Sequence, residues 1–198
     1  MAAMTTLETA QEFGEDLRGI TRAQYDTLIE AGQLVDEKVE LLRGMIVEMA
    51  SKGVPHDMAV QWLTMWFARR LPEDLHVRSQ SAWAATADSE PEPDLAIVPA
   101  RWPAPDGMRT HPHLAELLIE VAASSLRRDL GVKAGIYAEA GLAHYWVVDL
   151  PAREVVVHSA PVEGVYQHIR REAAPGVLTA VDIQVPLADL FAFAFGDP

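Results

Sequence analysis

The amino-acid sequence predicts an α/β fold in which a mixed central β-sheet is flanked by helices. Two buried strands, 117–121 and 145–148, stand on either side of one helical segment, 125–140, and this strand–helix–strand order is typical of the class. Of the 198 residues, 49% are hydrophobic, which is enough for one core. We therefore expect a single domain over 20–198 after a flexible lead-in at 1–19, which is polar and weakly periodic.

A short helix and a β-hairpin are the first elements that we expect. Thr21 and Gln24 fit a capping box, in which each side chain bonds the backbone amide of the other, and Gly32 ends the helix. The aliphatic runs 38–42 and 45–49 enclose a two-residue Arg-Gly turn, which predicts a hairpin.

The next segments alternate between regular structure and proline-rich loops. The segment 55–70 begins with a proline and carries apolar residues at helical spacing, so it predicts a helix. Alternation over 76–83 predicts a strand, and the compact apolar run 95–98 predicts another. The proline-rich segments 86–93 and 101–113 are expected to be loops.

The central stretch of the chain carries the clearest pattern. The continuous apolar run 117–121 predicts a buried strand, and a serine pair then caps a helix over 125–140. A second buried strand follows at 145–148. After a turn, the segments 154–158 and 165–170 are expected to extend the sheet.

The composition excludes several classes of protein. No cysteine is present, so disulfides, thiolate zinc sites, iron–sulfur clusters and thiol nucleophiles are ruled out. The net charge of −13 argues against broad binding to nucleic acid or anionic membranes, but leaves room for a small basic site. No apolar run approaches the roughly 20 residues that cross a bilayer, and the N-terminus shows no secretory signal pattern. We expect a cytoplasmic protein with no membrane partner.

Two carboxylates occupy positions where a carboxylate is costly. Asp94 stands at the head of the apolar run 95–98, and Glu120 lies near the end of the strand 117–121. An unpaired charge there is strongly unfavourable, so each group should be paired, protonated or bound to a metal. If the two strands are neighbours, both carboxylates can bind one Mg²⁺ ion, which takes one or two carboxylates and keeps several waters. A buried salt bridge or a strand-end cap is the alternative.

Lys133 is the third candidate. It lies four residues after Asp129 and four before Tyr137, so a regular helix places all three on one face. In a functional interpretation, its ammonium orients the attacking hydroxide or offsets charge on the scissile phosphate. In the alternative, Lys133 and Asp129 form a surface ion pair worth roughly a few tenths of a kcal/mol.

Several segments follow one another in an order that resembles a known family. They are 39–49, Pro93-Asp94-Leu95, 118–121, Asp129 through Lys133 to Tyr137, and Gly141 with 145–149. In these segments the chain resembles the Uma-type family of “putative restriction endonucleases”, a branch of the PD-(D/E)xK nuclease superfamily. The resemblance spans about residues 20 to 190. It implies a restriction-endonuclease-like core and Mg²⁺-dependent hydrolysis of phosphodiesters.

The resemblance also assigns roles to individual residues. Asp94 matches the Asp of the PD element, Glu120 matches the acidic residue of (D/E)xK, and the carbonyl of Val121 is implied as a further metal ligand. The lysine position of the motif holds Ala122 instead. Lys133 on the following helix is the substitute, similar to the migrated lysine of other branches of the superfamily.

Glu40 and His56 resemble further family residues, an acid near the site and a histidine that opens a helix. Glu40 has the alternative of an exposed strand residue facing Arg43 or Lys38. His56 has the alternative of a helix cap or a surface residue, kept neutral because the N-terminal end of a helix disfavours a cation.

The leading hypothesis is an endonuclease that uses Mg²⁺, or alternatively Mn²⁺, to hydrolyse DNA at Asp94 and Glu120. A homodimer is expected, because a site that cuts both strands of a duplex is often doubled by two-fold symmetry. Two alternatives stay open. One is a nuclease-like fold without turnover that acts as a binding or regulatory module, which the acidic charge and the missing motif lysine favour. The other is a metal-dependent hydrolase of a small phosphorylated substrate.

Overall fold

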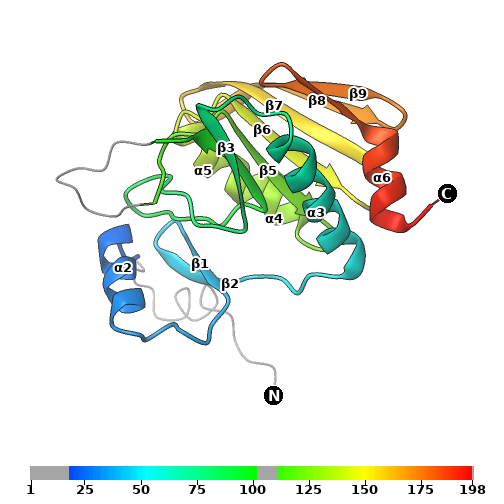
Figure 1. The fold of residues 1–198 in the computed structure, drawn as a ribbon. Helices are drawn as coiled ribbons and strands as arrows, with labels where there is room; N and C mark the ends of the chain where they lie inside the picture. The colour runs from blue at the N-terminus through cyan, green and yellow to red at the C-terminus, as the bar shows by residue number, and fades with distance from the viewer. Residues whose placement is uncertain (1–17, 102–110, 198) are drawn as a thin grey trace.

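The computed structural model describes residues 18–101 and 111–197, so most of the predicted lead-in, 1–19, and of the predicted loop, 101–113, lies outside the described residues. These residues form a six-stranded mixed β-sheet with helices on both faces (Figure 1). The predicted α/β class and the mixed sheet are therefore confirmed. Within the two described ranges, no helix combines the length and the apolar character that a membrane span needs.

The central sheet contains one parallel pair of strands among antiparallel neighbours. Its strands are, in spatial order, β3 (Leu75–Ser79), β4 (Leu95–Pro99), β5 (Leu117–Ala122), β6 (His144–Asp149), β7 (Glu154–Val162) and β8 (Val165–Ala173). β5 and β6 run parallel, and every other neighbouring pair is antiparallel. The predicted strand–helix–strand unit is this parallel pair with its helical crossover.

The helical part of the crossover between β5 and β6, residues 126–139, is continuous but is not one regular helix. It begins as α4 (Leu126–Arg128), continues as a π-helical segment (Asp129–Lys133) and ends as α5 (Ala134–Glu139). Gly141, with φ +76°, terminates it in the left-handed conformation, as the sequence predicts. A π-helical turn takes in one more residue than an α-helical turn, so it changes which residues share a face.

Separate layers cover the two faces of the sheet. On one face lie α3 (Val54–Ala68) and α6 (Leu187–Phe195), whose apolar side chains share one core with the sheet. Trp62 and Trp66 of α3 stack within this layer, with their ring centroids 4.6 Å apart. α5 covers the other face and forms a second core. Figure 1 shows the sheet between these layers.

The alternation of side chains along β5 decides where its one acidic residue points. Ile119 belongs to the core under α3 and α6, whereas Leu118 belongs to the core under α5. Successive side chains of a strand point to opposite faces, so Glu120 lies on the α5 side with Leu118. There it is 4% exposed.

The N-terminal elements lie at one end of the sheet (Figure 1). They are α2 (Arg22–Glu30), which starts with the predicted capping box, and the predicted hairpin of β1 (Val39–Leu42) and β2 (Met45–Glu48). Leu41 and Glu90 exchange two main-chain hydrogen bonds, 2.8 and 3.3 Å long, which attach the hairpin to the segment before β4.

The structure corrects the prediction in two places. The predicted strand 76–83 is wrong beyond Ser79, because Gln80 has φ +48° and turns the chain out of the sheet. A second hairpin, β9 (Val177–Ala180) and β10 (Ile183–Pro186), and the helix α6 were not predicted.

Candidate active site

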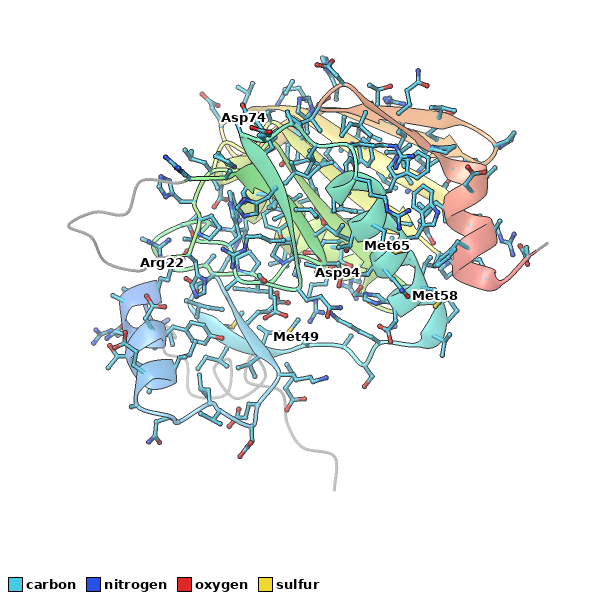
Figure 2. All side chains as sticks on the ribbon, viewed as in Figure 1. Arg22, Met49, Met58, Met65, Asp74 and Asp94 are labelled. Carbon is cyan, nitrogen blue, oxygen red and sulfur yellow. The ribbon has the colours of Figure 1, made fainter. Side chains whose placement is uncertain are left out.

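A cavity of about 40 Å³ lies where the start of β4, the end of β5 and the segment after β2 meet. This is more than the roughly 10–15 Å³ that one water molecule requires. Five acidic residues line it, and we name it the carboxylate cavity: Glu40, Glu92, Asp94, Glu120 and Asp129. Figure 2 shows Asp94 at the end of the sheet nearest the hairpin β1–β2, with Met49, another lining residue, close by.

Asp94 is held on both of its carboxylate oxygens. Oδ2 accepts a 2.9 Å hydrogen bond from the amide of Val121, beyond the point at which β4 and β5 stop pairing. Oδ1 lies 3.0 Å from Nζ of Lys52 and 3.1 Å from Nε2 of His56. Burial raises the pKa of Asp94, but His56, Lys52 and the Val121 amide together outweigh burial and hold this pKa below its usual value.

Among the described residues, the donors that contact Glu120 meet on one of its oxygens. Oε1 accepts hydrogen bonds from Nζ of Lys133 at 2.9 Å and from the hydroxyl of Tyr137 at 2.7 Å. Burial raises the pKa of Glu120 to about 8, in spite of the opposing charge of Lys133. The position of Tyr137 between Glu120 and the ring of Tyr145 fixes the carboxylate against the α5 layer.

Lys133 lies between two acids that come from distant parts of the chain. Its Nζ is 2.9 Å from Glu120 Oε1 and 2.9 Å from Glu40 Oε2, and its side chain is 3% exposed. Burial alone would lower the pKa of Lys133, but Glu120, Glu40 and Asp129 raise it above its usual range. The amide of Glu92 also donates to Glu40 Oε2, at 3.1 Å, and completes this buried cluster.

Several carboxylate oxygens around the cavity have no hydrogen-bond donor among the described residues. Oε1 of Glu40 and Oδ1 of Asp129 are both buried and lack a hydrogen-bond donor. Glu40 Oε1 is 3.9 Å from a guanidinium nitrogen of Arg128, too far for a hydrogen bond. Oδ2 of Asp129, in contrast, accepts from the hydroxyl of Ser125 at 2.5 Å. Buried oxygens without donors need a partner, and a water molecule or an ion can supply one.

The donor set fits a hard divalent cation held largely through water. Within residues 18–101 and 111–197, no group of three or more His, Asp or Glu side chains is arranged to hold a metal as it stands. Asp94 and Glu120 nonetheless line one cavity with oxygen donors alone. Mg²⁺ commonly uses one or two carboxylates and keeps several waters, so two carboxylates and a small hydrated cavity suit it.

The structure brings all the sequence-predicted site residues to this cavity. They are Glu40, His56, Asp94, Glu120, Val121 and Lys133. The alternative of an exposed Glu40 is wrong, since the residue is 1% exposed and pairs with Lys133. His56 is buried on α3 rather than lying on the surface. The surface ion pair of Lys133 with Asp129 is also wrong, because both side chains are buried and Lys133 pairs with glutamates instead.

Two further cavity residues, Lys52 and Glu92, were not predicted as site residues from the sequence. Lys52 lies in an irregular segment between β2 and α3, where no periodicity marks an inward side chain. Glu92 lies in the acidic, proline-rich segment that was predicted only to be a loop. Its position directly before Pro93 and Asp94 was the one available hint.

The α/β fold of this chain is shared with a solved structure. The architecture matches the crystal structure of a “putative nuclease belonging to DUF820” from Anabaena variabilis, with a TM-score of 0.66 and 15% sequence identity. The match covers 79% of this chain and 91% of that chain. At this identity, the likeness establishes the shared fold.

The sequence matches the Uma2 family, described as “Putative restriction endonuclease”, over residues 23–186, and the chain belongs to this family. The resemblance noted in the sequence is therefore confirmed. Family membership and the shared fold together support a nuclease. Comparison with curated proteins gives no match.

Proposed function

We propose that this chain is a metal-dependent endonuclease that hydrolyses DNA phosphodiester bonds at the carboxylate cavity. The observation that carries the proposal is the convergence of Asp94 and Glu120, from adjacent strands, on one small cavity beside a buried lysine. Membership of the Uma2 family supports the same class of reaction.

In this proposal, Asp94 and Glu120 hold a Mg²⁺ ion, with Mn²⁺ as the alternative, and the carbonyl of Val121 is a further ligand. The chemistry that a divalent ion would supply there is a lower pKa for a bound water molecule and compensation of charge on the scissile phosphate. Both carboxylates must be ionised for this purpose. Burial raises the pKa of Glu120, and a divalent cation bound beside it would favour its ionised form.

The other predicted residues position these ligands. Lys133 sits between Glu120 and Glu40, and its charge favours the ionised form of Glu120. His56 fixes the orientation of Asp94 through Oδ1, and the amide of Val121 fixes it through Oδ2. In the reaction, a water oxygen adds to phosphorus, the bond from phosphorus to one sugar oxygen breaks, and that oxygen takes up a proton.

The test is plasmid nicking in Mg²⁺ and in Mn²⁺ by the wild-type chain and by Asp94→Asn and Glu120→Gln, which keep the side-chain shapes. We expect each substitution to lower the nicking rate by about 100-fold or more, since each removes a charge at the reacting centre. Glu139→Gln is the matched control, because Glu139 is an exposed acid of the same crossover, paired with Arg43, outside the cavity. It should nick at the wild-type rate.

Equal residual nicking in all four proteins would refute the assignment. Absence of nicking by wild type, combined with Mn²⁺ binding in calorimetry and hydrolysis of nucleotides or phosphate monoesters, would favour a hydrolase of small phosphorylated substrates. Absence of nicking and of Mn²⁺ binding would leave a nuclease fold that acts as a binding module.

The proposal includes a homodimer, because cutting both strands of a duplex is simplest with two sites related by two-fold symmetry. Light scattering coupled to gel filtration measures the mass of the particle directly. A particle of 21.7 kDa, the mass of one chain, would contradict this part of the proposal.

A further inference from the structure

Lys52 is the most accessible cation in the carboxylate cavity that touches a proposed metal ligand. It lies in the segment between β2 and α3, and its Nζ is 3.0 Å from Asp94 Oδ1. The side chain of Lys52 is 26% exposed, whereas that of Asp94 is 7% exposed. The ammonium therefore stands between a buried carboxylate and the solvent.

The two lysines of the cavity differ in how firmly they are held. Lys133 bridges Glu40 and Glu120 at 2.9 Å each and is 3% exposed, so moving it would take the shared cation away from two buried carboxylates. Lys52 makes one ion pair, with Asp94. If Lys52 moves away, Asp94 keeps its contacts with His56 and with the amide of Val121. Lys52 is thus the lysine that can leave its partner.

Lys52 contacts Oδ1 of Asp94, and Oδ2 already accepts from the amide of Val121, so a divalent ion that binds Asp94 at Oδ1 would compete with Lys52 for this oxygen. Two positive charges cannot share that oxygen at contact distance without strong repulsion. We infer that Lys52 is a displaceable cation: it neutralises Asp94 while no divalent ion is bound, and on metal binding it swings out to contact the phosphate of the substrate. This inference rests on the proposed nuclease function.

In its second position, Lys52 keeps its proton and takes no part in bond formation or cleavage. Its charge stabilises the negative charge that grows on the phosphate oxygens as water adds to phosphorus. A flexible four-carbon side chain on an irregular segment suits such a movement, because few packing contacts have to break.

The inference predicts effects of opposite sign on metal affinity and on turnover. Lys52→Gln removes the competing charge, so calorimetry without DNA should show Mn²⁺ binding about tenfold tighter than wild type. The same substitution should lower plasmid nicking at saturating Mn²⁺ by about tenfold or more. A lysine that only stabilised the fold would weaken both together.

Lys38→Gln is the matched control, because it removes the same charge from an exposed lysine on the same side of the hairpin. Its Mn²⁺ affinity and nicking should stay within about twofold of wild type, because screening weakens the effect of a charge that touches no ligand. Lys52→Arg, which keeps the charge, should keep the wild-type Mn²⁺ affinity. Thermal denaturation of each variant verifies that it is folded.

Unchanged or weaker Mn²⁺ binding by Lys52→Gln would overturn the inference, as would unchanged nicking. Either result, with an active wild-type enzyme, leaves the proposed nuclease function intact. An inactive wild-type protein that binds no Mn²⁺ would instead overturn the proposed function, and this inference with it.

Discussion

The two halves of the carboxylate cavity are built from the same chemistry but are held in different ways. In the inner half, Lys133, Glu40 and Glu120 form an ion triad that is almost completely buried. In the outer half, Asp94 pairs with Lys52, whose side chain is 26% exposed. Both halves combine lysines with carboxylates, so burial is the main difference between them.

Because of this difference, the inner half is suited to stabilising the fold, and the outer half is suited to exchanging its cation. Removing one partner of a buried ion cluster leaves an uncompensated charge, which is far more costly than losing an exposed pair. The inner half therefore holds β1, β5 and the crossover in one arrangement. The outer half can change partners at little cost. Substitutions that affect the two halves unequally test this comparison.

The largest effect is expected for Lys133→Met. It removes the cation that lies between the buried Glu40 and Glu120, and the free energy of unfolding should fall by about 3–5 kcal/mol. Lys52→Met is the paired substitution in the outer half and should cost under about 1 kcal/mol. Urea denaturation at pH 7 measures both. Similar losses for the two variants would show that the halves do not differ.

A smaller effect is expected for Tyr137→Phe, which removes the hydroxyl that donates to Glu120 Oε1 at 2.7 Å. The loss should be about 1–3 kcal/mol, because the buried carboxylate loses a donor. Tyr166→Phe is the control, since the buried hydroxyl of Tyr166 has no hydrogen-bond partner within the described residues. Its removal should leave stability unchanged or slightly higher. Equal losses in urea titrations would refute the argument.

Glu90 sharpens the comparison, because it is a buried acid with no lysine beside it. Among the described residues its charged partner is Arg22, whose Nε is 3.8 Å from Oε2, and burial raises the pKa of Glu90 from 4.5 to about 7. The folded state thus binds the proton more tightly than the unfolded state. Stability from this group is full below about pH 4.5 and is lost as pH rises towards 7.

Glu90→Gln should remove this pH dependence and raise the free energy of unfolding at pH 8 by about 1–2 kcal/mol, after allowance for solvent screening. The measurement is urea denaturation at a series of pH values between 4.5 and 8. Glu37→Gln serves as control, because Glu37 is exposed, and it should follow the wild-type curve. The prediction would be contradicted if the free energy of unfolding of the wild type rose between pH 4.5 and 8. It would also be contradicted if Glu90→Gln showed the same dependence on pH as the wild type.

Local signals in the sequence were sufficient wherever a short motif fixes the backbone. The capping box at Thr21 and Gln24, the left-handed Gly141 and the turn of the first hairpin each appear as predicted. The second hairpin gave no such signal. Its turn places Val181 and Asp182 at φ +45° and +62°, a conformation that normally calls for glycine or asparagine.

Asp94 and Glu120 could be predicted because an acid in an apolar strand is conspicuous in any sequence. The residues that contact these acids were harder to predict from the sequence. Glu40 reaches Lys133 from the first hairpin, and that contact depends on how the hairpin packs against the sheet. Lys52 lies on an irregular segment, so its inward direction is set by the tertiary structure alone.

The π-helical segment Asp129–Lys133 has a consequence for the length of the crossover. Because it contains one residue more than a regular helix of the same span, deletion of the half-exposed Val132 would convert it into α-helix without removing a core side chain. Residues before the deletion would then rotate by about 100° about the helix axis relative to those after it. Ser125 and Asp129 would turn away from the cavity while Tyr137 stayed in place, so the spacing of this site depends on a single inserted residue.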